Sequence, residues 1–230
     1  MNKLCENYAY LIQNRYYLFN NLWGADTGNG SQCTWPAASE VCPLAWSTQW
    51  NWSGSAHTIK SYAAMVWGWH WGWKVADCGL PVQLASLQRL RSTWEFNLTH
   101  TVPGGTNVTY DIWLSSNPHA DNENPTGEVM IWLYQTGDIT PIGSEVDRVT
   151  IEGVKWHLWK GPHPVSGWPV YSFVRVENTG SQTLDLMNFF QHLTDFGLNL
   201  KDYLLGVQTG PEVFSGEGTL QTTYYDIDMK

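Results

Sequence analysis

Short stretches in which apolar and polar residues alternate recur along this chain of 230 residues, and they constrain its fold more than any other feature. Successive side chains of a β-strand point to opposite faces, so this alternation is typical of strands with one buried face. Examples, separated by Gly, Pro and Asn, are "QWNWSG", "LRSTWEFNLTH", "VTYDIWLSS", "GEVMIWLY", "DRVTIEGVKWHLWKG" and "GTLQTTYYDIDM". About ten such stretches predict an all-β fold, an antiparallel two-sheet sandwich or jelly roll.

One segment departs from this pattern. "LDLMNFFQHLTDFG" places Leu186, Phe190 and Leu193 at helical spacing, with Asp185 as a plausible N-cap and Gly197 as the stop. We expect one helix over about 185–196, packed on the outside of a sheet by its apolar stripe. No repeat or low-complexity linker divides the chain, so residues 1–230 are expected to form a single domain.

The charge balance excludes several classes of partner. Charged residues make up only 14% of the chain and the net charge is −9, without a basic cluster. Such a chain is not expected to bind nucleic acid or anionic membranes. No apolar stretch approaches the length of a membrane span. The N-terminus "MNKLCENYAY" lacks the apolar core of a signal peptide, so a mature chain with a start Met is expected.

Cysteine and aromatic content suggest an exported protein that binds sugars. Four Cys, at 5, 33, 42 and 78, show no metal-like spacing, which favours two disulfides with three possible pairings. The seven His residues are scattered, so neither a metal nor another cofactor is expected. Fifteen Trp and eleven Tyr exceed what core packing requires, and aromatic rings suit the flat apolar faces of sugars.

"GEVMIWLY", residues 127–134, carries a carboxylate at the start of an apolar strand. Period-2 geometry places Val129, Ile131 and Leu133 on one face, and Glu128 on the other with Met130, Trp132 and Tyr134. The first face is an ordinary core, whereas the second suits a groove. A lone Glu at a strand terminus is more commonly an idle, solvated residue, so a second acid is needed for a functional interpretation.

Two further acids provide that context. Glu212 in "VQTGPEVFSGEG" follows Gly210 and Pro211, which we expect to hold a defined bend, and precedes two apolar residues that raise a carboxyl pKa. In "VTYDIWLSS", alternation turns Asp111 away from the core, where it can orient Glu128 by a hydrogen bond. Two carboxyls in unlike environments suit glycoside hydrolysis. Solvated surface acids are the alternative interpretation.

The combination of "NNLWG", "YDIWL", "GEVMIWL", "GDITPIGS" and "GPEVFSG" resembles glycoside hydrolase family 12 over essentially the whole chain. The resemblance implies a β-jelly roll of two sheets with one helix, an open cleft for β-1,4-glucans and retention of anomeric configuration. It implies that Glu128 is the nucleophile, Glu212 the acid/base and Asp111 the neighbour that hydrogen-bonds the nucleophile.

The same resemblance implies the substrate-binding residues. Those on the non-reducing side of the cleft are Tyr8, Asn21 and Trp23, and those of a loop that closes over it are His70 and Trp71. Other cleft-lining positions are Met130, Trp132, Pro141, Gln208 and Phe214. The alternative for each aromatic residue is a place inside the sandwich.

The resemblance also bears on the cysteines. Cys5 and Cys33 match the family's N-terminal disulfide, which leaves Cys42 to pair with Cys78. Where bacterial relatives often have a local Cys pair around the His-aromatic-Gly loop, this chain has Trp69 and Trp73.

The sequence therefore predicts a secreted, monomeric endo-β-1,4-glucanase that acts by double displacement on cellulose, mixed-linkage glucan or xyloglucan. A xyloglucan-specific enzyme of the same fold is a close alternative. A non-catalytic carbohydrate-binding jelly roll is the rival from another class, and it needs no paired Glu.

Overall fold

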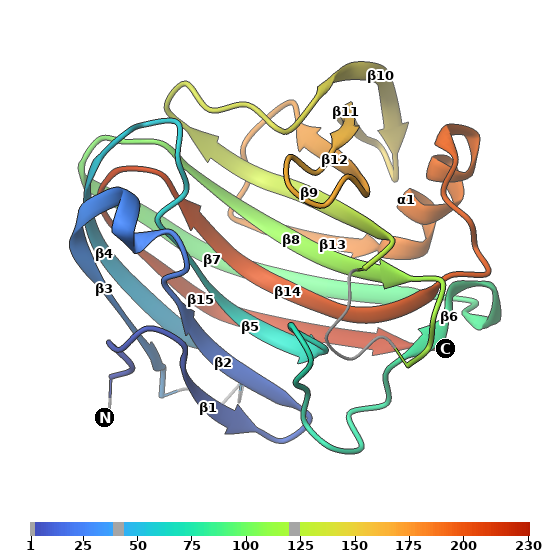
Figure 1. Cartoon of the computed structure of the whole chain (residues 1–230), viewed down its shortest axis with the longest axis horizontal. Coiled ribbons are helices and arrows are strands. Elements are labelled where there is room, and N and C mark those ends of the chain that lie inside the picture. Colours follow the sequence, from blue (N-terminus) through green and yellow to red (C-terminus); the bar gives the residue numbers. More distant parts are fainter. Residues whose placement is uncertain (1–2, 39–43, 120–124) are drawn as a thin grey trace.

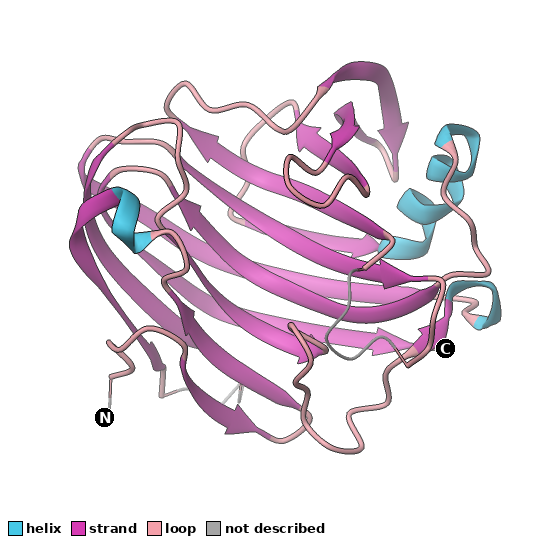
Figure 2. Ribbon diagram, viewed as in Figure 1, coloured by secondary structure: helices cyan, strands magenta, loops and turns pink. Residues whose placement is uncertain are grey.

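Two β-sheets form most of the protein, and the computed structural model describes residues 3–38, 44–119 and 125–230 (Figures 1 and 2). The larger sheet contains, in spatial order, β1 (Ala9–Gln13), β2 (Tyr16–Asn21), β5 (Ser61–Gly68), β14 (Tyr203–Val213), β8 (Thr106–Ser115), β9 (Gly127–Thr136), β12 (Pro169–Arg175), β11 (Val154–Pro162) and β10 (Ser144–Ile151). Short β6 (Val82–Gln83) pairs with β14. The smaller sheet is β13 (Ser181–Asp185), β7 (Leu90–Val102), β15 (Gly216–Met229), β4 (Trp46–Gly54) and β3 (Gly28–Pro36).

The described pairings are antiparallel with one exception. Strand β12 runs parallel to β9, because the chain leaves β9, forms the β10–β11 hairpin and returns between β9 and β11. The predicted two-sheet jelly roll is therefore confirmed, but the larger sheet is mixed and not purely antiparallel. None of the helices in the described ranges has the length and hydropathy needed to cross a membrane.

The core lies between the two sheets and is built from the alternation seen in the sequence. In β8 and β9 the buried residues Tyr110, Ile112, Val129 and Ile131 face the smaller sheet, where Tyr110 contacts Trp94 of β7 at 5.4 Å between ring centroids. The opposite face of the larger sheet, called the outer face below, carries two further apolar clusters. Apolar cover on both faces explains why several strands read as nearly continuous apolar runs.

The predicted helix is α1 (Leu186–Leu193), extended by a 3₁₀ turn, η3 (Thr194–Phe196). Asp185 caps it by accepting a hydrogen bond from Met187 N, and Gly197 ends it in the left-handed region. Its apolar stripe belongs to the shared core, where Phe189 contacts Trp156 of β11 and Phe173 of β12. The helix therefore covers the inner face of β11 and β12, and does not lie outside the sandwich. Two further 3₁₀ turns are η1 (Ala25–Thr27) and η2 (Leu84–Ser86).

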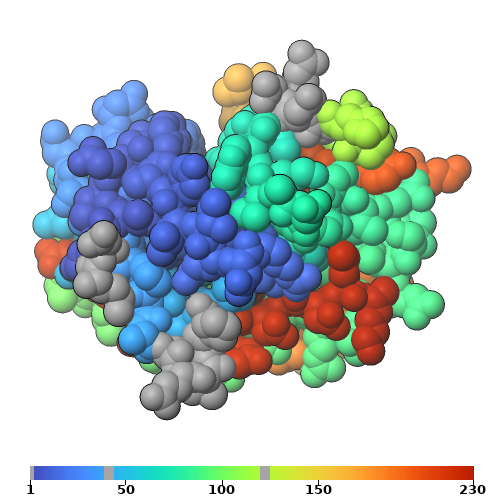
Figure 3. All heavy atoms as spheres, turned by 90° about the horizontal axis from the view of Figure 1, so that it is seen from below, coloured from blue at the N-terminus to red at the C-terminus, as the bar shows by residue number. Residues whose placement is uncertain are grey.

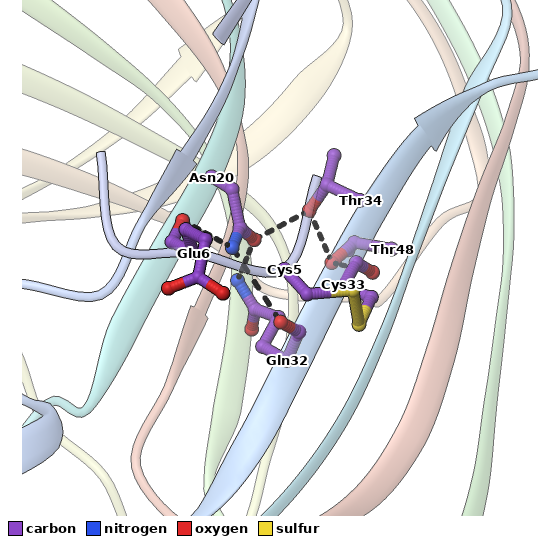
Figure 4. The surroundings of a disulfide bond; sticks show 7 residues. All are labelled: Cys5, Glu6, Asn20, Gln32, Cys33, Thr34 and Thr48. Carbon is purple, nitrogen blue, oxygen red and sulfur yellow. Dashed lines mark hydrogen bonds between the residues drawn. A yellow bond between two sulfur atoms is a disulfide. The ribbon is translucent and has the colours of Figure 1, made fainter. Parts of the chain in front are cut away.

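The N-terminal segment is tied to β3 by the predicted Cys5–Cys33 disulfide (Figure 4). Beside it, buried Asn20 joins the two layers, since its amide nitrogen donates to the carbonyl oxygens of Glu6 and Gln32 and its Oδ1 accepts from Thr34 Oγ1. Buried polar groups of this kind are costly unless paired, so the network fixes how β2 approaches β3.

The second predicted disulfide is not formed. Cys78 is a buried free thiol that belongs to the core, and its Sγ lies 3.8 Å from the carbonyl oxygen of Leu80. The indole of Trp67 donates to the backbone carbonyl of Cys78 at 2.7 Å, which holds the chain at this residue against the core. Cys42, its predicted partner, lies outside the described residues.

We expect Cys5→Ser to lower the melting temperature by roughly 6–15 °C, because the bridge spans 28 residues and such a loop contributes about 3–4 kcal/mol in the chain-entropy model. Scanning calorimetry measures the shift. The control is the wild-type protein under reducing conditions, which should melt like the variant. If the variant had the same melting temperature as the oxidised wild type, the bridge would contribute nothing to stability.

Candidate active site

Glu128 is the second residue of β9 and lies on the outer face of the larger sheet, opposite Trp113 of β8 and Val170 of β12. Its side chain is buried, with 7% of its surface exposed. Met130 and Trp132 follow it on this face, as alternation predicts. Tyr134 does not, and the prediction for it is wrong.

A β-bulge explains the position of Tyr134. The β8–β9 register shifts between Val108 and Thr109, so that Val108 pairs with Tyr134 and Thr109 with Trp132. Leu133 is the extra residue, and the phase of the strand changes after it. Tyr134 consequently packs against the core between the sheets.

Glu212 lies near the end of β14, opposite Asn107 of β8 and Tyr62 of β5. The expected bend at Gly210 and Pro211 is wrong, because both residues lie inside this central strand. The β5–β14 ladder skips them, which accommodates a proline that has no N–H to donate. Gly210 is required there, since a Cβ would meet the carbonyl oxygen of Ala63 at 1.8 Å.

Each glutamate accepts one hydrogen bond from a residue that the sequence did not single out as functional. The indole Nε1 of Trp168 donates to Glu128 Oε2 at 3.2 Å, and Asn107 Nδ2 donates to Glu212 Oε2 at 2.6 Å. Asn107 begins an Asn-x-Thr sequon, but it is fully buried and its side chain is engaged by the glutamate. Trp168 lies just before β12, held by stacking on His163 at 4.4 Å. Only its tertiary position reveals its partner.

Burial controls the ionisation of both glutamates. Burial, opposed by the hydrogen bond from Trp168 and reinforced by the negative charge of Glu212, raises the pKa of Glu128 to about 7. Burial likewise raises the pKa of Glu212 to about 7, against the hydrogen bond from Asn107. Two acids with pKa values raised toward neutrality, one of which senses the charge of the other, suit acid and base catalysis at neutral pH.

Asp111 is the third acid of the group, and it is 7% exposed on β8. Burial, followed by the charges of Glu128 and Glu212, holds its pKa well above the usual value. The register places Asp111 opposite Met130 and Glu128 diagonal to it on the same sheet face, and the charge of Glu128 contributes to the raised pKa of Asp111. The hydrogen bond from Asp111 to Glu128 stays a prediction.

Tyr8, Asn21 and Trp23 lie together beside β1 and β2. Tyr8 and Trp23 expose 53% and 52% of their surfaces, and Leu22 is buried in the core as alternation predicts. Asn21 is buried, and its Oδ1 accepts from the backbone N–H of Trp23 at 3.1 Å, which orients the exposed indole. Tyr8 stacks on Phe19 at 6.1 Å. Exposed rings held by buried neighbours suit a sugar platform.

His70 and Trp71 follow β5, and the structure connects the first of them to Gln208. Burial lowers the pKa of His70 to about 4, so its ring is neutral and Nδ1 accepts from Gln208 Nε2 at 2.8 Å. The loop is closed by two backbone hydrogen bonds between His70 and Trp73. Trp71 is 47% exposed and its ring contacts those of Trp113 and Trp168.

The remaining predicted lining residues are less accessible than expected. Met130, Trp132 and Phe214 are almost fully buried in the outer-face cluster, and Pro141 is half-buried between β9 and β10. The outer face nevertheless carries buried polar atoms that have no partner among the described residues, namely Trp132 Nε1, Ser172 Oγ and Gln208 Oε1. Burying a polar atom unpaired is costly, so these atoms suit a hydroxyl-rich ligand.

Comparisons with known proteins point to one family. The sequence profile of the family described as Glycosyl hydrolase family 12 matches residues 14–230. Endoglucanase S of Pectobacterium parmentieri is 34% identical, over 96% of this chain and 84% of its own. Xyloglucan-specific endo-beta-1,4-glucanase A of Emericella nidulans is 36% identical, over 98% and 90%.

Solved structures give the same result at the level of the fold. The native family 12 xyloglucanase from Bacillus licheniformis superposes with a TM-score of 0.91 at 30% identity, covering 100% of both chains. Endoglucanase 3 of Trichoderma harzianum gives 0.88 at 31% identity, covering 100% of this chain and 97% of its own. By sequence profile, by full-length relatives and by fold, the chain belongs to glycosyl hydrolase family 12.

Proposed function

We propose that the protein is a secreted endo-β-1,4-glucanase that retains anomeric configuration, with Glu128 as nucleophile and Glu212 as acid/base. One observation carries these roles: two buried or partly buried glutamates on one sheet face, each with a pKa near 7, one of which senses the charge of the other. A non-catalytic sugar-binding sandwich has no need for such a pair.

The reaction has two steps. In the first, a carboxylate oxygen of Glu128 attacks the anomeric carbon while the Glu212 carboxyl gives its proton to the departing glycosidic oxygen. A glycosyl ester on Glu128 and a shortened glucan result. In the second step Glu212, now ionised, takes a proton from water as the water oxygen attacks the anomeric carbon, and Glu128 leaves as a carboxylate. Two inversions give net retention.

The surrounding residues support this division of labour. The Trp168 indole stabilises the ionised form of Glu128, which the attack requires. Burial and the charges of Glu128 and Glu212 hold the pKa of Asp111 well above its usual value, which favours the uncharged form of this acid beside the nucleophile. Because β9 and β14 are inner strands of the sheet, both carboxyls stand on rigid backbone.

The substrate follows from the platform and from the relatives. Tyr8, Asn21 and Trp23 would hold glucosyl units on the non-reducing side, and the free Gln208 Oε1 would accept a sugar hydroxyl. The relatives named above include an endoglucanase and a xyloglucan-specific enzyme, so linear and branched β-1,4-glucans are both candidates. The Cys5–Cys33 bridge supports export to an oxidising compartment. We propose one catalytic domain, acting as a monomer.

Reducing-end release from carboxymethylcellulose, mixed-linkage β-glucan and xyloglucan tests this function. We expect hydrolysis of at least one polymer with a rapid fall in viscosity, as internal cleavage produces. NMR should detect the β-anomer first. Polymer binding without any release of reducing ends would leave only a binding module, and first appearance of the α-anomer would exclude the two-step mechanism.

We expect Trp168→Phe and Asn107→Ala to shift opposite limbs of the pH profile of kcat/KM. Each variant removes a donor to a carboxylate, so each raises the pKa of its own glutamate. Glu128 must be ionised, so Trp168→Phe moves the acidic limb to higher pH and narrows the profile. Glu212 must be protonated, so Asn107→Ala moves the basic limb to higher pH and widens it. If Trp168→Phe shifted the basic limb and Asn107→Ala shifted the acidic limb, Glu212 would be the nucleophile and Glu128 the acid/base.

Trp23→Ala should lower kcat/KM on short cello-oligosaccharides by the equivalent of about 1–3 kcal/mol, the usual contribution of a stacked ring. The loss of kcat/KM on polymer should be smaller, because a polymer also binds at other subsites. Since Trp23 is half exposed, the melting temperature should change little. A large fall in melting temperature with unchanged kinetics would assign Trp23 to stability and not to binding.

A further inference from the structure

Two exposed aromatic rings of the described residues have no part in the cleft proposed above. The aromatic side chains that are exposed within residues 3–38, 44–119 and 125–230 are Tyr8, Tyr10, Trp23, Trp71 and Trp73. Three of them are assigned to sugar binding, which leaves Tyr10 and Trp73, with 51% and 38% of their surfaces exposed. Together with exposed Ile12 they form a surface called the β1 patch below. Exposed apolar groups that gather in one place commonly mark a binding surface.

The rings of the β1 patch are held in place by their neighbours. Tyr10 contacts Trp73 at 4.9 Å between ring centroids. Tyr17, which is buried in an apolar cluster of the outer face, contacts Tyr10 at 6.3 Å and Trp73 at 4.6 Å. The backbone of Trp73 is fixed by two hydrogen bonds with that of His70. Rings that are already ordered lose little conformational freedom when a ligand binds, so the β1 patch is preorganised.

The two exposed tryptophans of the loop after β5 have different neighbours. Trp71 contacts Trp168, which donates to Glu128. Trp73 instead contacts rings of β1 and β2. Strand β1 is the edge of the larger sheet, so the β1 patch lies at the margin of the outer face. Figure 3 shows the teal loop against the blue N-terminal strands. A ligand on the β1 patch would therefore lie outside the surroundings of the nucleophile.

The β1 patch continues the surface assigned above to glucan. Tyr8 immediately precedes β1 and Tyr10 is the second residue of this strand, and both rings contact aromatic rings of β2. Tyrosine and tryptophan combine an apolar face with a polar edge, which suits the flat face of a sugar ring and its hydroxyls. A stable dimer generally needs about 20–30 residues from each partner, many more than the β1 patch offers. These observations favour a polysaccharide over a second copy of the chain.

We propose that the β1 patch binds a chain of insoluble cellulose outside the cleft. While one chain occupies the cleft, a neighbouring chain of the same surface lies against Tyr10 and Trp73, so the enzyme stays adsorbed between cleavage events. Adsorption through a second site raises the effective concentration of further chains at the cleft. The inference rests on the proposed function for the identity of the polymer, but its readout is adsorption, which needs no catalysis.

Depletion of protein from solution by microcrystalline cellulose tests the inference, with Glu128→Gln as the background so that hydrolysis does not alter the surface. In this background Tyr10→Ala should lower the partition coefficient about fivefold or more, from the lower end of what a stacked ring contributes upward. In the active enzyme, Tyr10→Ala should leave kcat/KM on soluble cellotetraose within about twofold of wild type, because a short chain in the cleft does not reach the β1 patch.

The matched control is Leu11→Ala. Leu11 is also exposed on β1, but it pairs with buried Leu18 on the core side of the sheet. Its replacement should leave adsorption and kcat/KM within about twofold of wild type. Tyr10→Phe keeps the ring and should adsorb like the wild type.

Trp73→Ala removes the other ring of the pair. It should reproduce the loss of adsorption, and it decides the question if Tyr10→Ala does not fold. Unchanged adsorption, or an equal loss of kcat/KM on cellotetraose, would overturn the inference. So would a wild-type dimer in sedimentation that Tyr10→Ala dissociates, since a second copy would then cover the β1 patch. Wild-type protein that cleaves soluble glucans without adsorbing to cellulose would overturn this inference alone, whereas adsorption without cleavage of any glucan would overturn the proposed function.

Discussion

Glu128→Ala is expected to lower kcat by several orders of magnitude, more than the roughly 10²–10⁴-fold that positioned acid–base catalysis alone contributes. Without the carboxylate no glycosyl ester forms, so the two-step route is lost. Added azide should restore part of the activity by entering the space left by the side chain, and the product should be a glycosyl azide of inverted configuration. Steady-state kinetics with NMR of the azide product measures both effects.

The isosteric variant Glu128→Gln controls for folding. Because the folded-state pKa of Glu128 is raised to about 7, the carboxyl contributes stability that is fully present below its unfolded pKa and is lost as pH rises through the folded pKa. The melting temperature of the wild type should therefore fall between about pH 4.5 and 7, and that of Glu128→Gln should fall less over the same range. If Glu128→Ala kept more than a tenth of the wild-type kcat, Glu128 would not be the nucleophile.

Glu212→Ala is expected to reduce activity in a manner that depends on the leaving group. Hydrolysis of polymer should fall by about 10²–10⁴-fold, since the departing sugar oxygen needs a proton. An aryl cellobioside with a weakly basic leaving group needs none, so formation of its glycosyl-enzyme should be nearly unaffected. Azide should then replace water in the second step and yield a glycosyl azide of retained configuration.

The pH profile gives an independent readout for Glu212. Burial raises its pKa to about 7, so in the wild type the proton needed for the first step is lost as pH rises through neutrality. Glu212→Ala should abolish that basic limb. Equal losses on polymer and on the activated aryl substrate would mean that Glu212 serves binding or folding and not proton transfer.

Local pattern predicted most of the strands, the helix, and the sheet face of Asp111 and Glu128. Alternation in β8 placed Tyr110 and Ile112 in the core and Asp111 on the other face, and the same reasoning separated Leu22 from Trp23. The Asp185 cap and the Gly197 stop likewise bounded the helix segment. These features depend only on strand or helix periodicity and on residues a few positions apart, which the sequence displays directly.

Long-range contacts decided the rest. Trp168 is 40 residues from Glu128, and Asn107 is 105 residues from Glu212, so neither hydrogen bond leaves a local signal. The bulge at Leu133 and the course of β14 through Pro211 arise from pairing with neighbouring strands, which local alternation and turn chemistry cannot predict. The fate of Cys78 was set by core packing and not by cysteine count. The sequence by itself determined on which face of the sheet Asp111 and Glu128 lie, because side-chain direction follows from periodicity. The tertiary structure decided their ionisation and partners, because burial and hydrogen bonding depend on strands that meet only in the folded sheet.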